Sequence, residues 1–244
     1  MHPEAYVEMA DTESRHWWFT GRRAVLRSLI ASLKLPRDAK ILEVGCGTGG
    51  NLAMLSVFGR ISALEMDSTA RSIATRKTAG RFDIRAGSCP ADIPYAGEKF
   101  DLICLFDVLE HIDEDVATLA ALKQLLTGRG RILLTVPAYA WLWSDYDEFL
   151  YHKRRYSAAG LRATVSAAGL RCDRMSYFNT LLFPLIAVVR LKERLLGAAA
   201  TSGRDVPARP VNWLLRQAFS AERFLLPVVR LPFGVSLFAI LRAG

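Results

Sequence analysis

The stretch Ile41-Leu42-Glu43-Val44-Gly45-Cys46-Gly47-Thr48-Gly49-Gly50 decides how this chain folds. It predicts a buried strand that runs directly into a glycine-rich turn, followed by a helix over residues 51–57. Glycines in such a turn adopt positive φ and let a ligand lie against bare backbone. The helix N-terminus directs unpaired N–H groups at that ligand. Because Gly45, Gly47 and Gly50 also satisfy the dinucleotide fingerprint, the stretch predicts a nucleotide-like cofactor without deciding which one.

Two acidic residues narrow the kind of cofactor. Glu43 lies inside the strand before the first glycine, and Glu65 ends the next expected strand, which begins at Ile61. An acid about twenty residues after the start of such a loop accepts hydrogen bonds from ribose hydroxyls. Since dinucleotide enzymes and S-adenosylmethionine (SAM) enzymes both use this acid, the choice between them depends on the rest of the chain.

The composition predicts a packed globular protein. The chain has 244 residues, of which 51% are hydrophobic and 23% charged, enough for one large domain with insertions. Its four cysteines are scattered without metal-ligand spacing, so we expect buried thiols in a reducing compartment and no metal site. The N-terminus lacks a basic apolar leader, and no apolar run reaches a membrane-spanning length. These features together predict a cytoplasmic protein.

Charge is distributed unevenly along the chain. Residues 1–150 carry a net charge of −3 and residues 151–244 a net charge of +11. Such asymmetry indicates an anionic partner for the C-terminal part, such as a phosphorylated substrate or a membrane surface. Solvated arginines on helix faces explain the pattern equally well. The sequence argues against a nucleic-acid partner, because it has no Asn/Asp-Pro-Pro-Tyr signature of base methylation and no RNA-binding appendage.

Expected strands and helices alternate from residue 40 onward. Strands are predicted at 40–44, 61–65, 82–86, 100–105, 131–136, 170–178 and 235–241, and helices at 24–35, 51–57, 68–79, 114–126 and 161–168. This alternation predicts an α/β, doubly wound fold whose mostly parallel sheet is covered on both faces. Ligands of such sheets bind at the carboxyl ends of the strands. Those ends carry Glu43, the glycine loop, Glu65, Ser88-Cys89 and Phe106-Asp107.

An aromatic cluster precedes the first expected helix. It consists of His16-Trp17-Trp18-Phe19 and is followed by Gly21-Arg22-Arg23. Neighbouring residues of a helix diverge by about 100°, so the two tryptophans would not both face one core. The cluster therefore predicts either a lid over a ligand or an N-terminal arm packed on the domain.

Four motifs, in the right order and spacing, resemble those of class I SAM-dependent methyltransferases. They are ILEVGCGTGG (41–50), Glu65, IPYAGEKFDLICLFDVLEHI (93–112) and LLTGRGRILLTVPA (125–138). The HWWF…GRR entry, Trp143-Ser144-Asp145-Tyr146-Asp147 and His152-Lys153-Arg154-Arg155-Tyr156 are similar to a bacterial subset of these enzymes. The resemblance implies a Rossmann-like seven-stranded sheet with one antiparallel C-terminal strand beside the strand at 170–178. It also implies an N-terminal helical lid and an insertion before the last strand.

The resemblance further implies SAM as the cofactor and S-adenosylhomocysteine as its product. The glycine loop would hold the methionine moiety, Glu65 the ribose, and the turn after the third strand the adenine. The family often has an acid near the adenine, and Asp92 is the nearest here. The implied cofactor-binding residues are Glu43, Gly45, Cys46, Gly47, Gly49, Glu65, Met66, Ser88, Cys89, Phe106 and Asp107.

Candidates for acceptor chemistry follow the fourth and fifth strands. His111, His152 and Tyr156 are the catalytic candidates, because methyl transfer to a hydroxyl or ammonium requires a base. Glu110 and His111 could instead be structural. Arg154 and Arg155 could clamp a phosphate or carboxylate, although pairing with Asp145 in a structural salt-bridge knot fits equally well. The candidate substrate-binding residues are Trp17, Trp18, Arg22, Tyr139, Trp143, Arg154 and Arg155.

The last third of the chain changes in character. Residues 179–232 are apolar and basic, and residues 197–212 within them predict an exposed flexible loop. We therefore divide the chain into an N-terminal lid and helix (1–36), a SAM-binding core (37–178), this insertion (179–232) and a final core strand (233–244). The insertion could be a substrate cap, a homodimer surface or a contact with the inner face of the membrane.

The leading hypothesis is a SAM-dependent methyltransferase that acts on a small-molecule or lipid- or sugar-linked acceptor. An NAD-dependent oxidoreductase is the first alternative, and it rests on Gly45, Gly47, Gly50 and Glu65 alone. A non-catalytic scaffold with the SAM fold is the second. The intact glycine loop and Glu65 argue against this scaffold.

Overall fold

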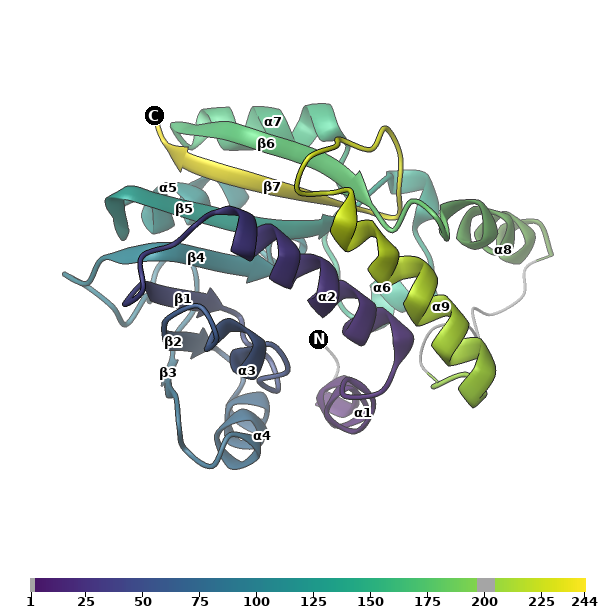
Figure 1. Cartoon of the computed structure of the whole chain (residues 1–244), viewed down its shortest axis with the longest axis horizontal. Helices are drawn as coiled ribbons and strands as arrows, with labels where there is room; N and C mark the ends of the chain where they lie inside the picture. The colour runs from purple at the N-terminus through teal and green to yellow at the C-terminus, as the bar shows by residue number, and fades with distance from the viewer. Residues whose placement is uncertain (1–2, 197–204) are drawn as a thin grey trace.

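A seven-stranded sheet forms the centre of the molecule, whose computed structural model describes residues 3–196 and 205–244 (Figure 1). The strands lie in the order β3-β2-β1-β4-β5-β7-β6. Their bounds are β1 Lys40–Val44, β2 Arg60–Glu65, β3 Asp83–Ala86, β4 Phe100–Phe106, β5 Leu126–Pro137, β6 Leu170–Phe178 and β7 Ser236–Ala243. Only β7 runs antiparallel, paired with both β5 and β6. The predicted α/β class and the antiparallel last strand are confirmed.

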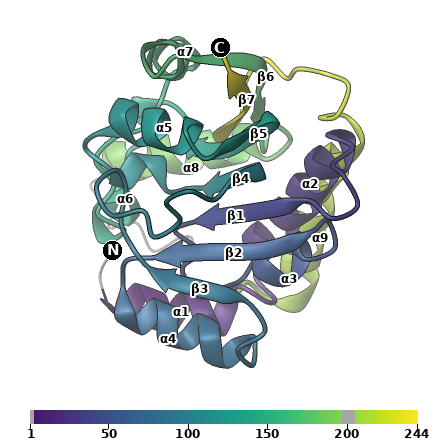
Figure 2. The ribbon, with the colours of Figure 1, turned by 90° about the vertical axis from the view of Figure 1, so that its left-hand side faces the viewer.

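Helices cover both faces of this sheet, as Figures 1 and 2 show. The α-helices are α1 Pro3–Thr12, α2 Trp17–Ser32, α3 Leu52–Leu55, α4 Ser68–Lys77, α5 Asp115–Lys123, α6 Asp145–Phe149, α7 Ala158–Ala167, α8 Phe183–Leu196 and α9 Arg209–Ala221. Three short 3₁₀ helices are η1 Leu109–His111, η2 Ala140–Leu142 and η3 Glu222–Phe224. None of the described helices combines the length and apolar character needed to cross a membrane.

Alternate residues of the central strands pack into two separate hydrophobic layers, one on each face of the sheet. In β4, Ile103 and Leu105 face the layer that α5 and α7 cover. Leu102 and Cys104 face the layer that α2, α3 and α9 cover. Because both faces are buried, the strands read as continuous apolar runs rather than as an alternating pattern. This double burial explains why continuous apolar runs located the central strands.

The helices depart from the predictions in three places. Helix α2 begins at Trp17 rather than residue 24, because the His16 side chain caps it by accepting from the Trp18 N–H (3.2 Å). The loop expected at 197–212 was wrong in its last part, since Arg209–Asn212 open α9, whose first turn accommodates Pro210. Residues 197–204 of that loop lie outside the described residues. Helices α1 and α6 were not predicted.

The segment between β6 and β7 folds back on itself around one buried carboxylate. Glu222 accepts hydrogen bonds from the N–H groups of Asn179 (2.7 Å), Thr180 (2.6 Å) and Leu181 (2.9 Å). These donors lie at the start of the segment, whereas Glu222 follows α9 near its end. Helix α9 also packs along α2 through Phe219, which lies 5.3 Å from the Trp18 ring, centroid to centroid.

Candidate active site

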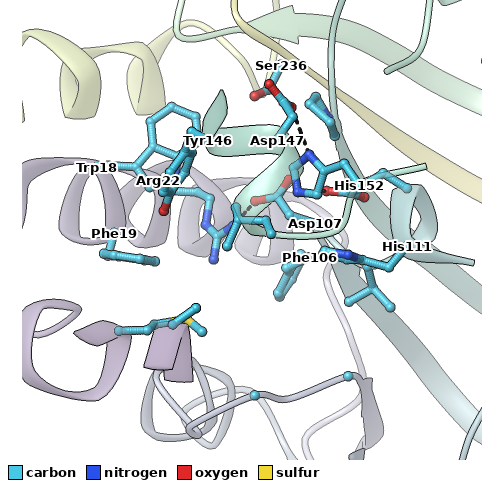
Figure 3. Close-up of a pocket in the computed structure, with 18 of the residues that line it drawn as sticks. Trp18, Phe19, Arg22, Phe106, Asp107, His111, Tyr146, Asp147, His152 and Ser236 are labelled. Atoms are coloured by element: carbon cyan, nitrogen blue, oxygen red, sulfur yellow. Dashed lines mark hydrogen bonds and ion pairs between the residues drawn. The ribbon is translucent and has the colours of Figure 1, made fainter. Parts of the chain in front are cut away.

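A cavity of about 1420 Å³ lies over the carboxyl ends of β1, β2 and β4, between α1, α2, α6 and α8 (Figure 3). The structure brings most predicted site residues to its wall. They are Trp17, Trp18, Arg22, Gly45, Cys46, Gly47, Glu65, Met66, Ser88, Cys89, Phe106, Asp107, His111, Trp143, His152 and Arg155. Five predicted residues are described but do not line the cavity, namely Glu43, Gly49, Tyr139, Arg154 and Tyr156.

The glycine loop is anchored to β2 through its backbone. The N–H groups of Gly45 and Cys46 both donate to the Leu64 carbonyl, at 2.9 and 3.1 Å. Gly45 has φ +66°, and a Cβ there would lie 2.8 Å from Cγ2 of Val108. A side chain is therefore excluded both by the backbone conformation and by contact. The loop leaves bare backbone facing the cavity, as the sequence predicted.

Glu65 is held rigidly at the edge of this loop. Its Oε2 accepts from the Gly47 N–H (2.8 Å) and its Oε1 from the Asp67 N–H (2.9 Å). The side chain is buried yet lines the cavity, and burial raises its pKa. Each carboxylate oxygen keeps a second lone pair. The carboxylate is thus oriented by the backbone and can still accept hydrogen bonds from a ligand.

Glu43 does not line the cavity itself, but it is hydrogen-bonded to a residue that does. Its Oε1 accepts from Nδ2 of Asn51 (2.8 Å), and Asn51 lines the cavity. Its Oε2 has no hydrogen-bond partner in the described part of the chain. Burial raises the pKa of Glu43 to about 8. Gly49 also serves the architecture, because its position is packed against Ala74 and Leu52.

Helix α1 and the residue after it, Glu13, cover the glycine loop; an N-terminal helical lid was expected, but Glu13 was not named as part of it. Glu13 accepts from the Thr48 hydroxyl (2.8 Å) and pairs with Lys77. It lies so close to Gly50 that a Cβ there would overlap its carboxylate. Tyr6 and Met9 of α1 line the same part of the cavity. A sequence signal was hardly available, since Glu13 precedes the loop by more than thirty residues.

A buried ion pair divides the cavity near its middle. Arg22 of α2 pairs with Asp107, which follows β4 (Figure 3). The other oxygen of Asp107 accepts from the Thr135 hydroxyl (3.0 Å), and Asp107 has φ +57°. Burial lowers the pKa of Arg22 to about 10, so the guanidinium stays charged at neutral pH. The pair joins the N-terminal helices to the sheet at the point where Phe106 also faces the cavity.

A second ionic cluster lies beyond this pair, around Asp147 of α6. Asp147 accepts from Arg155 through both carboxylate oxygens (Nε–Oδ1 2.8 Å, Nη2–Oδ2 3.0 Å), and its Oδ1 lies 2.8 Å from Nδ1 of His152. Burial raises the pKa of Asp147, but the hydrogen bonds with His152 and Arg155 outweigh it and lower the pKa to about 2. The sequence analysis named Asp145 as the partner for the arginines. In the structure, Arg155 pairs with Asp147 instead.

Glu110 and His111 complete this side of the cavity. Burial raises the pKa of Glu110 to about 8, and it lowers the pKa of His111 to about 3. The His111 and His152 rings meet edge to face with centroids 4.7 Å apart. His111 is therefore neutral at physiological pH and close to a second imidazole.

Three predicted acceptor residues are engaged elsewhere. The Tyr156 hydroxyl donates to Asp115 (2.9 Å), because a short parallel bridge to Ala138 turns Tyr156 into the core. Arg154 pairs with Asp115 (3.0 Å) at the surface. Tyr139 stacks on Tyr177 with ring centroids 5.1 Å apart. These contacts explain why none of the three reaches the cavity.

The far wall is apolar and comes from the segment between β6 and β7. Four residues of α8 and its approach face the cavity, and one residue of α9 joins them. They are Leu182, Leu185, Ile186, Val189 and Leu215. Both tryptophans of the N-terminal cluster also line the cavity while packing against Phe219. The contacts with Phe219 fit the interpretation as a packed arm, and the role of a lid over a ligand stays a prediction.

Comparison with known proteins gives a consistent family. The sequence model of the methyltransferase domain family matches residues 18–174. A protein of Mycolicibacterium smegmatis named "probable S-adenosylmethionine-dependent methyltransferase" is 27% identical over 65% of this chain and 61% of its own length. A protein of Mycobacterium tuberculosis with the same description is 24% identical over 65% of this chain and 57% of its own length. The chain thus spans about 60% of the length of these curated relatives.

Solved structures agree on the fold. A chain from a complex that contains the Haloferax volcanii Trm112 methyltransferase activator aligns with a TM-score of 0.62, at 17% identity over 98% of this chain and 93% of its own. A TehB-like SAM-dependent methyltransferase of Corynebacterium glutamicum aligns with 0.56, at 18% identity over 89% and 87%. The [4+2]-cyclase SpnF aligns with 0.58, at 18% identity over 90% and 81%. Since one neighbour is a cyclase, the reaction must be argued from the site.

Proposed function

Starting from the fact that this chain belongs to the methyltransferase domain family, we propose that it transfers the methyl group of SAM to an amphipathic acceptor and releases S-adenosylhomocysteine. The acceptor has a polar reacting group and a hydrophobic body. It is a small molecule or the head of a lipid-linked molecule.

One observation carries this proposal: a single cavity joins the glycine loop and Glu65 to an apolar wall. Its volume, about 1420 Å³, exceeds the roughly 300–1,000 Å³ of most small-molecule pockets. The cavity can therefore hold two molecules side by side. A cofactor at the strand ends would direct its reactive end toward Phe106 and Asp107, with the acceptor beyond them.

The residues at the loop end suit SAM. The oriented carboxylate of Glu65 can accept from both ribose hydroxyls, and the bare backbone at Gly45 and Gly47 leaves room for the methionine moiety. Ser88 and Cys89 line the wall where the adenine would lie, held by hydrogen bonds between Ser88 and Asp92 (2.7 and 2.9 Å). Helix α1 would cover the cofactor through Tyr6 and Met9.

The chemistry requires little covalent participation by the protein. The nucleophilic atom of the acceptor forms a bond to the methyl carbon, the bond from that carbon to sulfur breaks, and a proton leaves the acceptor. Alignment and exclusion of water supply most of the acceleration in such a displacement. Of the three predicted catalytic residues, His111 and His152 line the cavity, and we assign the reacting group of the acceptor to their side.

The apolar wall supports a hydrophobic body for the acceptor. Leu182, Leu185, Ile186 and Val189 come from the segment 179–232, which we propose is a substrate cap on the core. Arg190 lines the same wall, where it pairs with Glu193 (2.8 Å). An acceptor with an anionic group would compete for this guanidinium.

The outer surface of the same cap supports contact with an anionic membrane. Helices α8 and α9 project at one end of the molecule (Figure 1). These helices and the segment after η3 expose large apolar side chains, including Val188 (64%), Trp213 (59%), Leu214 (61%) and Val228 (77%). Exposed arginines such as Arg216 lie among them, and the C-terminal part of the chain carries the excess positive charge. Apolar and basic side chains together suit a lipid interface.

Calorimetric titration with SAM, S-adenosylhomocysteine and NAD tests the cofactor. We expect micromolar binding of the first two ligands and none of NAD. Binding of NAD alone would contradict methyl transfer. Binding of none of the three would favour a non-catalytic scaffold.

Vesicle flotation tests the membrane contact. We expect the protein to float with vesicles that contain phosphatidylglycerol and to stay behind with pure phosphatidylcholine. Changing both Leu214 and Val228 to Ser should reduce flotation. The matched control is Val57→Ser, because Val57 is equally exposed (63%) on a different part of the surface. An equal loss in the control variant would argue against a specific face.

A further inference from the structure

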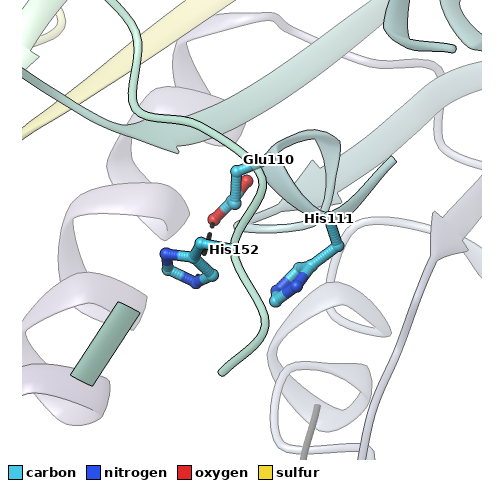
Figure 4. A group of neighbouring side chains, drawn as sticks. All are labelled: Glu110, His111 and His152. Atoms are coloured by element: carbon cyan, nitrogen blue, oxygen red, sulfur yellow. Dashed lines mark ion pairs between the residues drawn. The ribbon is translucent and has the colours of Figure 1, made fainter. Parts of the chain in front are cut away.

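Three side chains with metal-binding atoms meet at the acceptor end of the cavity (Figure 4). Glu110 and His111 lie on η1, directly after β4, and His152 lies in the loop after α6. One ligand atom from each lies within 4.8 Å of the other two. The Lys153 N–H donates to the Glu110 carbonyl (2.8 Å), so the two backbone segments are tied beside the cluster. The chain thus builds this convergence from segments about forty residues apart.

Glu110 is the least explained residue of the cluster. Its side chain is fully buried, and neither carboxylate oxygen has a hydrogen-bond partner among residues 3–196 and 205–244. Its own backbone N–H is near but outside hydrogen-bond geometry, and Nε2 of His152 lies 4.0 Å away. Arg22 and Arg155, the nearby cations, are occupied by Asp107 and Asp147. A buried carboxylate without a partner is costly, so this position calls for a ligand.

The two histidines are arranged as ligands rather than as members of a hydrogen-bonded chain. Asp147 fixes Nδ1 of His152, which leaves Nε2 directed toward Glu110. A carboxylate on the far nitrogen is the usual support for a metal-binding histidine, because it sets the tautomer and the ring orientation. His111 is half-buried and stands edge to face against His152, with the ring centroids 4.7 Å apart.

We propose that Glu110, His111 and His152 bind one divalent transition-metal ion. Two imidazoles and one carboxylate suit Zn²⁺, Fe²⁺ or Co²⁺, whereas Mg²⁺ and Ca²⁺ prefer oxygen ligands. Ligand bonds of about 2.0–2.2 Å require donor atoms about 3.0–3.5 Å apart. Small side-chain rotations from the present 4.8 Å span therefore close the site.

Three protein ligands leave coordination positions open, and all three residues line the cavity. The ion would bind an oxygen of the acceptor there. If that oxygen is a hydroxyl, the ion lowers its pKa and the proton leaves to water before the oxygen attacks the methyl carbon. This role rests on the proposed function, whereas metal binding itself does not.

The test uses the full chain, first treated with a chelator and then titrated with Zn²⁺ in a calorimeter and with Co²⁺ in a spectrophotometer. We expect one ion per chain and the visible absorption of Co²⁺ bound to nitrogen ligands. Glu110→Gln should weaken binding at least tenfold. Asp147→Asn keeps all three ligands and should weaken binding by roughly 10–100-fold through the loss of support for His152. The control Glu114→Gln, an exposed acid four residues further along, should bind as the wild type does.

SAM affinity, measured for every variant, reports folding and separates the two proposals. Zn²⁺ binding that is absent in the folded wild type, or unchanged in Glu110→Gln, overturns the metal site. Such a result together with retained SAM binding leaves the proposed function intact. Metal binding without SAM binding would overturn the proposed function and leave the site.

Discussion

The two ends of the cavity are built by different means. At the loop end, backbone groups make the key contacts, with Gly45 and Cys46 donating to Leu64 and Gly47 donating to Glu65. At the histidine end, side chains hold one another, with Asp147 at the centre of an ionic cluster. Backbone contacts depend on a short local stretch. Side-chain clusters depend on the meeting of segments distant in sequence.

This difference has an energetic consequence. Oriented backbone donors need no desolvated ions, and a change of side chain nearby leaves them in place. A buried ion that loses its partner is strongly unfavourable, because the other charge remains desolvated. The histidine end should therefore be fragile to single substitutions, whereas the loop end should lose affinity without losing stability.

Removing the centre of the ionic cluster should have the largest effect. Asp147→Ala leaves Arg155 and His152 buried without their acceptor, so we expect a loss of about 3–5 kcal/mol in the free energy of unfolding. Urea denaturation measures this loss. SAM affinity of the folded fraction should stay near the wild-type value, because the loop end does not depend on Asp147.

The exposed neighbour Asp145 on the same helix provides the control. Asp145→Ala should change stability by less than about 1 kcal/mol. Equal losses in the two variants would show that the cluster contributes no more than an ordinary surface charge, and the contrast between the two ends would disappear.

Glu43 is the most deeply buried of the acids at the loop end, and its titration tests how this end responds to pH. The unfolded chain releases this proton near the ordinary pKa, whereas the folded protein keeps it up to about pH 8. The folded state therefore binds more protons in between, and stability falls as pH rises through this window. Glu43→Gln, which can still accept from Asn51, should lack this fall. Between pH 5.5 and 7.5 the free energy of unfolding of the wild type should therefore fall by about 2–3 kcal/mol relative to that of Glu43→Gln.

Thermal or urea unfolding across that pH range is the measurement. Glu110 has a pKa raised in the same direction, but it is present in both proteins and cancels in the difference. Parallel pH profiles for wild type and Glu43→Gln would mean that Glu43 is ionised in the folded protein.

Glu65 tests the loop end directly. Glu65→Ala removes the acceptor for ribose hydroxyls and should weaken SAM binding by roughly 1.5–3 kcal/mol, a charge-assisted contact. Calorimetry measures the change. Glu65→Gln keeps one oxygen acceptor, so its SAM affinity should lie between those of the wild type and Glu65→Ala. Unchanged affinity in Glu65→Ala would overturn the ribose assignment.

The smallest effect on stability is expected from replacing Arg154. The adjacent Arg155 provides the comparison. Arg154 is one-third exposed, and its partner Asp115 keeps the hydrogen bond from the Tyr156 hydroxyl, so Arg154→Ala should cost less than about 1 kcal/mol in stability. Arg155→Ala leaves Asp147 buried without its bidentate partner and should cost several times more. Urea denaturation of both variants decides. Equal costs would place both arginines in a surface role.

The sequence predicted the sheet and the loop end because both depend on local patterns. Continuous apolar runs marked the central strands such as β4, whereas β3 and β6 mix polar and apolar residues. The motif from Ile41 to Gly50 marked the loop. The histidine end was predicted only in part. His111 and His152 were named from their position after strands. Asp145 was named as the ionic partner of the arginines, but Asp147, two residues further along, is the residue that pairs with Arg155.

Other misses share the same physical cause. Tyr156 was expected at the acceptor, yet the bridge between Ala138 and Tyr156 turns its side chain into the core. Glu13 was not considered, because its contact with Thr48 depends on how α1 folds back over the loop. Contacts between segments distant in sequence determine where each of these side chains lies. Such contacts leave no local pattern in a single sequence.

The cap leaves and re-enters the sheet at nearly one point. The Val235 N–H donates to the Asn179 carbonyl (3.4 Å), and Gly234 lies so close to Phe178 that any side chain there would overlap its carbonyl. The cost of closing a loop rises only by about 0.6 kcal/mol for each doubling of its length. Caps of quite different size could therefore replace this one without disturbing the sheet. Under the proposed function, such a junction would let evolution or engineering exchange the acceptor specificity as a module while the cofactor end is kept.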